Sequence, residues 1–306
     1  MQAFVAGAAV LATLGAATPA RDRFGVGVLR RDGVIIPFAA FNGKRWSSPW
    51  PVPALSLTVP VDLRALPSRW WGPTPALETW EATTIAGPLA LRVVQPEWVD
   101  VQCQRQIGLR TNYRSERGAP PPTEQPYPKD GLAVSPAQPI EPIKMVVGES
   151  ADVRPLLPEL LKAFNDAERI VEGRFGHPMA RRVREGREPL IEALYAVGDG
   201  PRIYYVEAIR QYRQLGLAVA DCTAIAFGTG WFVRDGAGVR PLKMAVDLLN
   251  CNRYGASYML PFGAMRLNNR LFWLAQFAGW EHERYVVLEI KAKTVDVIVN
   301  AWGGSC

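Results

Sequence analysis

The chain has 306 residues, of which 48% are hydrophobic and 21% are charged, so it has enough apolar material for two domains with buried cores. Its formal net charge is +6, but an acidic residue interrupts even the densest basic stretch, residues 181–187. Because nucleic-acid binding requires a concentrated basic face, this composition argues against a nucleic-acid partner.

Residues 1–20 form an apolar stretch that ends in small residues, and this pattern predicts a secretory signal peptide. No lysine or arginine precedes the apolar run, which leaves a buried N-terminal helix or a misassigned start as alternatives. The stretch is too short and too rich in alanine and glycine for a membrane span, so no transmembrane segment is expected. We therefore expect an exported protein of bacterial type, either periplasmic or secreted.

Four cysteines are spread along the chain without any C-x-x-C pair: Cys103, Cys222, Cys251 and Cys306. Metal-binding cysteines usually come in close pairs and the chain has only two histidines, so no metal site is expected. In an oxidising compartment, disulfide bonds are the expected state of these cysteines. Three pairings are possible, and the sequence does not choose among them. We expect at least one bridge, with Cys306 as its first candidate.

Residues 21–113 are expected to form the smaller, β-rich N-terminal domain. Asp32-Gly33 lies between two apolar runs, which is a strong signal for a β-hairpin, and Asn42-Gly43 predicts a second tight turn. Prolines between residues 49 and 67 restrict that part to loops or edge strands. The expected strands are residues 25–30, 34–41, a third strand that begins at residues 44–46 after the Asn42-Gly43 turn, 89–94 and 99–110.

Residues 114–150 are rich in proline and polar residues and have no apolar period, which predicts a linker between two domains. The one clear helical pattern follows in residues 151–188, where apolar residues recur at i, i+3, i+4 and i+7. Proline is tolerated in the first turn of a helix, so Pro155 and Pro158 place the helix start near Leu157. We expect the apolar face of this helix to pack on its own domain.

Residues 189–306 are expected to form the C-terminal domain, an antiparallel β meander closed as a barrel or folded as a sandwich. The prediction depends on eight apolar segments that are paired across tight turns: residues 190–197, 203–212, 223–233, 239–248, 258–267, 271–277, 284–291 and 294–302. The predicted fold class is thus mainly β, with two β-rich regions and one principal helix between them.

His282 is one of the two histidines, and it lies between Glu281 and Glu283. These three residues are the catalytic candidates of the chain. Side chains alternate along a strand, so the two acids would point away from His282 if one strand included all three. We therefore interpret the stretch as the corner of a β-hairpin with solvated glutamates. A catalytic His282 would require a distant partner such as Cys251 or Asp247.

Paired carboxylates are the other catalytic option, because glycoside hydrolysis uses two acids about 5–10 Å apart. Glu192 and Glu207 lie on neighbouring expected strands and are candidates for such a pair, although salt bridges to arginines explain them equally well. No dinucleotide-binding, nucleophile-elbow or P-loop motif is complete in the chain, so no cofactor is expected.

The chain contains ten tryptophans, and Trp70 and Trp71 fall in a proline-bounded stretch. Exposed aromatic faces on a β scaffold can stack on sugar rings or hold a partner peptide, whereas packing against proline rings is the structural alternative. Together these observations favour an exported, non-catalytic binding or envelope-associated protein, with a glycan or an envelope protein as partner. The alternatives are a secreted hydrolase and a structural subunit of a larger assembly.

Overall fold

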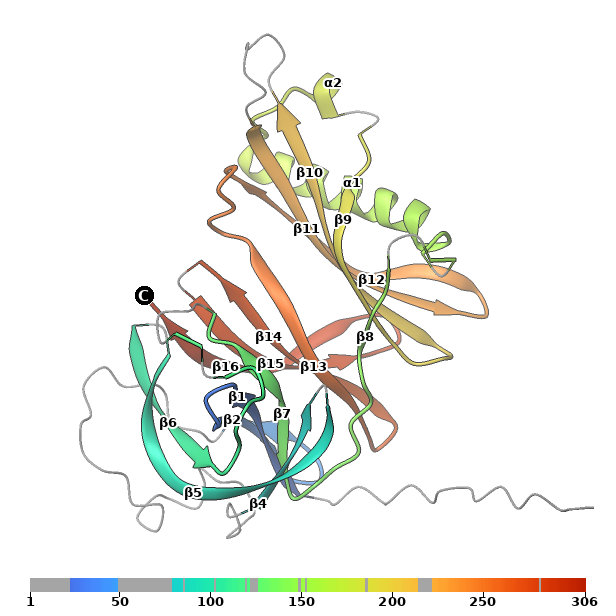
Figure 1. The fold of residues 1–306 in the computed structure, drawn as a ribbon. Coiled ribbons are helices and arrows are strands. Elements are labelled where there is room, and N and C mark those ends of the chain that lie inside the picture. The colour runs from blue at the N-terminus through green and yellow to red at the C-terminus, as the bar shows by residue number, and fades with distance from the viewer. Residues whose placement is uncertain are drawn as a thin grey trace, which may run out of the picture.

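The computed structural model describes residues 23–48, 79–84, 86–101, 103–118, 120–121, 126–147, 150–151, 153–184, 187–213, 222–280 and 282–306. In this part of the chain the protein is mainly β, with 16 strands and two helices. A barrel, a central sheet, a second sheet and a helix follow one another along the molecule (Figure 1). The expected signal peptide, residues 1–20, lies outside the described residues.

Six strands of the N-terminal region close into a barrel. They pair in the order β1-β7-β4-β5-β6-β2, and β1 pairs with β2 to complete the ring. Gly33 forms the β1–β2 turn with φ of 84°, a conformation that glycine adopts without steric cost. The strands are β1 Phe24–Arg30, β2 Val34–Phe41, β4 Thr79–Thr84, β5 Gly87–Val101, β6 Gln104–Thr111 and β7 Lys129–Ser135, with β3 Trp46–Ser47 paired to the end of β2.

The proline-rich stretch 114–150 differs from the linker that the sequence predicts. It contains β7 and β8 (Lys144–Met145), and β7 lies between β1 and β4 in the barrel. Leu132 and Val134 of β7 are buried in the barrel core. The strand escaped prediction because its signal is limited to seven residues between Pro128 and Pro136.

A four-stranded meander forms the central sheet, and both of its faces are buried. Tyr285 packs against Phe38 of the barrel, with ring centroids 5.4 Å apart. The next residue, Val286, faces the other way and shares a core with Tyr205 and Trp231 of the second sheet. The strands are β13 Ser257–Leu267, β14 Arg270–Gly279, β15 His282–Ile290 and β16 Val295–Ser305.

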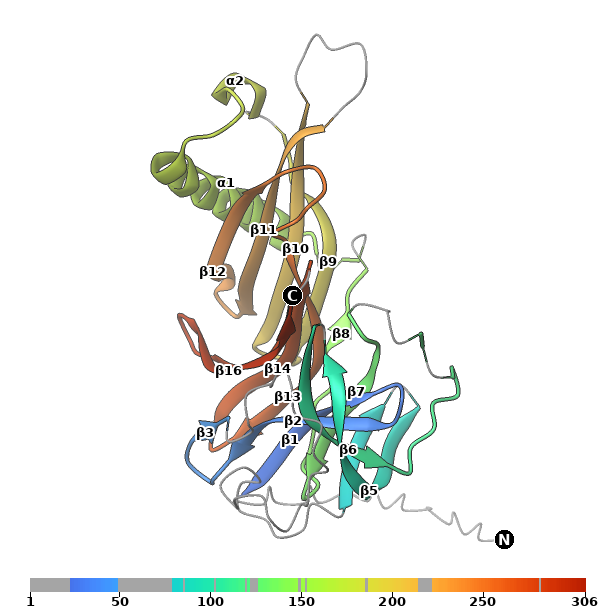
Figure 2. The same ribbon diagram turned by 90° about the vertical axis from the view of Figure 1, so that its left-hand side faces the viewer.

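The second sheet has the order β12-β11-β10-β9-β8, and α1 lies along the face that is turned away from the central sheet (Figure 2). Leu160 and Phe164 of α1 share a core with Tyr204 and Phe232. Gly228 of β11 lies beneath Phe164, where a side chain would clash with the ring. The elements are α1 Leu156–Phe175, α2 Arg181–Arg184, β9 Leu190–Val197, β10 Arg202–Arg213, β11 Cys222–Asp235 and β12 Gly238–Leu249.

The prediction of a mainly β protein with one principal helix between β regions is confirmed. The C-terminal meander is folded as two stacked sheets, because residues 250–256 break it between β12 and β13. The closed barrel belongs to the N-terminal region. Among the described helices, none combines the length and the apolar character needed to cross a bilayer.

Two disulfide bonds use all four cysteines. Cys103–Cys306 joins the β5–β6 turn of the barrel to the end of β16, and its Cα atoms are 5.0 Å apart. Cys222–Cys251 joins the start of β11 to the segment after β12, with Cα atoms 5.8 Å apart. The prediction of disulfide bonds is confirmed, and Cys306 takes part in one of them.

Candidate functional site

The Glu281-His282-Glu283 stretch forms the corner of the β14–β15 hairpin. β14 ends at Gly279, which is the cross-strand partner of His282. The Nδ1 atom of His282 lies 3.1 Å from the carbonyl oxygen of Trp280, so this ring nitrogen donates a hydrogen bond there. Cys251 is bridged to Cys222 and is therefore not a nucleophile for His282. Glu281 lies outside the described residues.

Glu283 is buried, with 1% of its surface exposed, whereas the sequence predicted a solvated glutamate. Its Oε1 atom accepts hydrogen bonds from the Lys129 ammonium, 2.8 Å away, and from the Tyr285 hydroxyl. Burial lowers the pKa of Lys129 and raises that of Tyr285. The prediction was wrong because the face of β15 that carries Tyr285 packs into the barrel core, where Lys129 of β7 pairs with Glu283.

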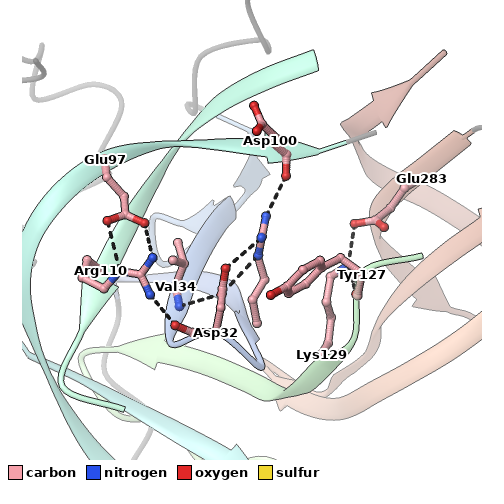
Figure 3. A network of polar contacts seen from close by, with 9 residues as sticks. Asp32, Val34, Glu97, Asp100, Arg110, Tyr127, Lys129 and Glu283 are labelled. Carbon is pink, nitrogen blue, oxygen red and sulfur yellow. Dashed lines mark hydrogen bonds and ion pairs between the residues drawn. The ribbon is translucent and has the colours of Figure 1, made fainter. Parts of the chain in front are cut away.

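The Lys129–Glu283 pair belongs to a polar network at one end of the barrel (Figure 3). Arg30 pairs with Asp32 and donates to the carbonyl oxygen of Asp100, both at 2.8 Å. Each cation of the network pairs with a carboxylate; the pairs are Arg30–Asp32, Arg110–Glu97 and Lys129–Glu283. These contacts join four barrel strands to β15, so we assign the network a structural role.

The paired-carboxylate candidates lie on neighbouring strands, but they have separate partners. Glu207 is buried between the two sheets and accepts hydrogen bonds from the Met259 amide at 2.6 Å and the Tyr205 hydroxyl at 3.2 Å. Burial, with a smaller effect of nearby Glu192, raises the pKa of Glu207 to about 7. Glu192 forms an ion pair with Arg253 at 2.9 Å. The two acids are therefore close, but their existing partners make structural roles sufficient.

A cavity of about 570 Å³ lies between α1, α2 and β10, and arginine is its commonest lining residue. The α1 residues of the lining are at positions 161, 165, 168, 169 and 172, so they share one helix face. The lining contains five arginines and three glutamates: Arg169, Arg181, Arg184, Arg187, Arg210, Glu168, Glu172 and Glu188, with Leu161 and Asn165. We call this cavity the arginine cleft. It is the candidate functional site of the described structure.

Arg210 is the most deeply buried cation of the arginine cleft, with 3% of its surface exposed. Its Nη1 atom donates to Glu168 at 2.6 Å, and its Nη2 atom donates to Asn165 at 2.8 Å. Its guanidinium also lies over the Phe164 ring, 4.8 Å from the centroid. The buried Nε atom of Arg210 has no hydrogen-bond partner among the described residues. A buried donor left unpaired costs about 1–3 kcal/mol, so an acceptor at this position would be favourable.

Glu168 holds Arg210 in place and is itself held by two further side chains. It accepts hydrogen bonds from the Tyr212 hydroxyl and from His177, whose Nε2 atom is 3.2 Å away. The Nδ1 atom of His177 accepts from the Met179 amide at 3.0 Å, so Nε2 carries the proton that is donated to Glu168. Burial raises the pKa of Tyr212, which keeps its hydroxyl protonated. Both ring nitrogens of His177 are thus engaged, which suits positioning rather than proton transfer.

Arg184 provides a second buried guanidinium on the opposite wall. Its Nη2 atom lies 2.5 Å from Glu172, and this hydrogen bond lowers the pKa of Glu172. The Nε atom of Arg184, like that of Arg210, is buried without a partner in the described part of the chain. Arg184 and Arg210 thus place two buried guanidinium groups in the walls of the cleft, where arginine suits the recognition of oxyanions.

The sequence contained one signal for this site, the basic stretch 181–187. An acidic residue interrupts this stretch, which argues against a concentrated basic face, whereas α2 places Arg181 and Arg184 on the wall of the cleft. Trp70 and Trp71, the aromatic candidates, lie outside the described residues. Within those residues, no group of three or more histidine, cysteine, aspartate or glutamate side chains is arranged to hold a metal ion.

The chain matches no protein-family model, and the searches of curated proteins and of solved structures find no match to it.

Proposed function

We propose that the protein is an exported, non-catalytic binding protein that holds an oxyanion group of its ligand in the arginine cleft. The single observation that carries the proposal is the lining of this cavity, in which five arginines, two of them buried, outnumber three glutamates. Phosphate, sulfate and carboxylate groups share the acceptor geometry that these donors require. We therefore identify the ligand only by its chemical class, a molecule that carries one of these oxyanion groups.

Export is supported by the signal-peptide pattern of residues 1–20 and by the two disulfide bonds, which are typical of oxidising compartments. A binding role, rather than a catalytic one, is supported because the cysteines and His177 already have bonding partners within the protein. Every cysteine is bridged, and His177 uses both ring nitrogens in structural hydrogen bonds. An anionic component of the cell envelope is the partner that this location and this cleft favour.

Titration calorimetry with inorganic pyrophosphate, polyphosphate and polygalacturonate tests the proposal. We expect Arg181→Ala with Arg187→Ala to weaken binding of the preferred anion at least tenfold. A matched variant, Arg240→Ala with Arg266→Ala, removes two charges away from the cleft and should change the affinity less than twofold. Equal weakening in both variants, or no binding of any of the three anions, would contradict the proposal.

A secreted hydrolase is the second candidate, and the proximity of Glu207 to Glu192 is the observation that favours it. In this mechanism, the protonated Glu207 would act as the general acid and Glu192 as the second carboxyl group. Release of reducing sugar from plant and bacterial polysaccharides is the test. Turnover that Glu207→Gln abolishes in a folded protein would establish the hydrolase and overturn the non-catalytic proposal.

A further inference from the structure

Two large aromatic rings stack on each other at the surface, and neither of them lines the arginine cleft. Tyr254 and Trp280 have ring centroids 4.6 Å apart and planes inclined by 25°. Their exposed fractions are 50% and 58%, so neither ring is used mainly to build the core. Large aromatic rings are on average largely buried in folded proteins. A stacked pair that stays exposed at the surface therefore points to a ligand-binding role.

The Tyr254 side of the pair is held by several independent contacts. The segment that carries it is joined to β11 by the Cys222–Cys251 bond. Arg253, which adopts a positive φ of 61°, donates to Glu192 and to the Tyr258 hydroxyl. These contacts fix the loop before any ligand binds, and preorganisation of this kind reduces the entropy lost on binding.

The Trp280 side is held by the β14–β15 hairpin. His282 donates through Nδ1 to the carbonyl oxygen of Trp280, and its ring lies over Gly279, where a side chain would clash with it. Ser257 and Gly279 are cross-strand partners, which brings the Tyr254 segment and the hairpin side by side. The histidine that stood out in the sequence thus supports the position of an exposed tryptophan.

The segment with Tyr254 also lines a hollow. Asn250 and Gly255 border a cavity of about 930 Å³, together with Asp247, Thr223 and the exposed ring of Phe175. Asp247 and Asn250 offer a carboxylate and an amide, which bind vicinal hydroxyl groups well. Burial raises the pKa of Asp247, as expected for a carboxyl group in a partly enclosed wall.

From this combination we propose a carbohydrate-binding site, in which the Tyr254–Trp280 pair stacks on the apolar C–H face of a pyranose ring. Asp247 and Asn250 would bind hydroxyl groups of the neighbouring sugar unit in the adjoining hollow. The hollow also has apolar lining residues, but Asp247 and Asn250 place a carboxylate and an amide beside the aromatic pair, and a pyranose offers the matching combination of an apolar face and hydroxyl groups. This inference is independent of the oxyanion proposed for the arginine cleft.

A glycan array of bacterial and plant oligosaccharides, followed by calorimetry with chitohexaose and cellohexaose, tests the assignment. We expect Trp280→Ala and Tyr254→Ala each to weaken binding of the preferred glycan at least tenfold, and Tyr254→Phe to retain it within threefold. Trp302→Ala is the matched control, because Trp302 is also an exposed tryptophan but lies on β16. The Trp302→Ala variant should bind the preferred glycan with an affinity within twofold of that of the parent protein.

Three results would overturn the assignment. They are the absence of any glycan bound in a Trp280-dependent manner, equal weakening by Trp302→Ala, and Trp280-dependent binding of peptides without binding of glycans. Circular dichroism and thermal unfolding of each variant separate a lost contact from a lost fold.

Discussion

Arg210 of β10 donates a hydrogen bond to Glu168 of α1 across 2.6 Å, and both side chains are at least 96% buried. The contact joins the helix to the second sheet and places a guanidinium on the wall of the arginine cleft. One ion pair thus serves both the packing of α1 and the charge of the candidate site. Loss of this ion pair is expected to affect the packing of α1 and the charge of the arginine cleft in different ways.

Replacing Glu168 by glutamine should lower the free energy of unfolding by about 3–5 kcal/mol, because it leaves the buried Arg210 without its counter-charge. Urea unfolding followed by circular dichroism measures this change. Asp166→Asn is the control, since Asp166 and Arg169 form a solvent-exposed ion pair on the same helix and its loss should cost less than about 1 kcal/mol. Equal effects of the two substitutions would show that the buried pair does not hold α1.

Lys129→Met should destabilise the protein by a similar amount, about 3–5 kcal/mol, because Glu283 would remain buried without its cation. The double variant with Glu283→Gln should recover part of this loss, since no uncompensated charge remains. Lys291→Met, which removes an exposed lysine, is the control. A double variant no more stable than Lys129→Met would contradict a direct coupling of the two side chains.

Removing the Cys103–Cys306 bond should lower stability by about 2–5 kcal/mol, because the bond closes a loop of 203 residues in the unfolded chain. The variant Cys103→Ser with Cys306→Ser, compared with the parent by urea unfolding, measures the effect. Intact mass after alkylation without reduction checks the premise. Four alkylated thiols in protein isolated from the periplasm or the medium would contradict the oxidised state.

Glu207 should make stability depend on pH between about 4.5 and 7. Its folded-state pKa of about 7 lies above the ordinary value of 4.5, so the folded state binds a proton more tightly than the unfolded state does. The stabilisation is complete below pH 4.5 and is lost as the pH rises through 7, with a total on the order of 3 kcal/mol. Unfolding experiments across this range should show a flatter profile for Glu207→Gln. An unchanged slope would contradict the raised pKa.

Local signals predicted the strands of the C-terminal half well. β9 spans residues 190–197 as expected, because a nearly continuous apolar run and the turn at Gly198 are both visible in a short window. Contacts between distant segments were not visible in this way. Glu283 looked solvated because its neighbours are polar, whereas its partner Lys129 lies 154 residues away.

The arginine cleft could not be predicted for the same reason. Arg210 and Glu168 are separated by 42 residues, and neither belongs to a recognisable motif. Only the packing of α1 on the second sheet brings the helix face with Glu168 and Glu172 against β10 and α2. Sequence patterns indicated the elements, and tertiary packing determined which charges meet.

The most direct test of the central claim is a crystal structure of the protein with pyrophosphate, refined beside a structure of the Arg181→Ala, Arg187→Ala variant soaked under the same conditions. We expect an oxyanion in the arginine cleft, with its oxygens about 2.7–3.2 Å from guanidinium nitrogen atoms of the arginines that line it. We expect no such density in the variant. Ordered water alone in the arginine cleft of the parent protein, with the anion bound elsewhere, would contradict the account.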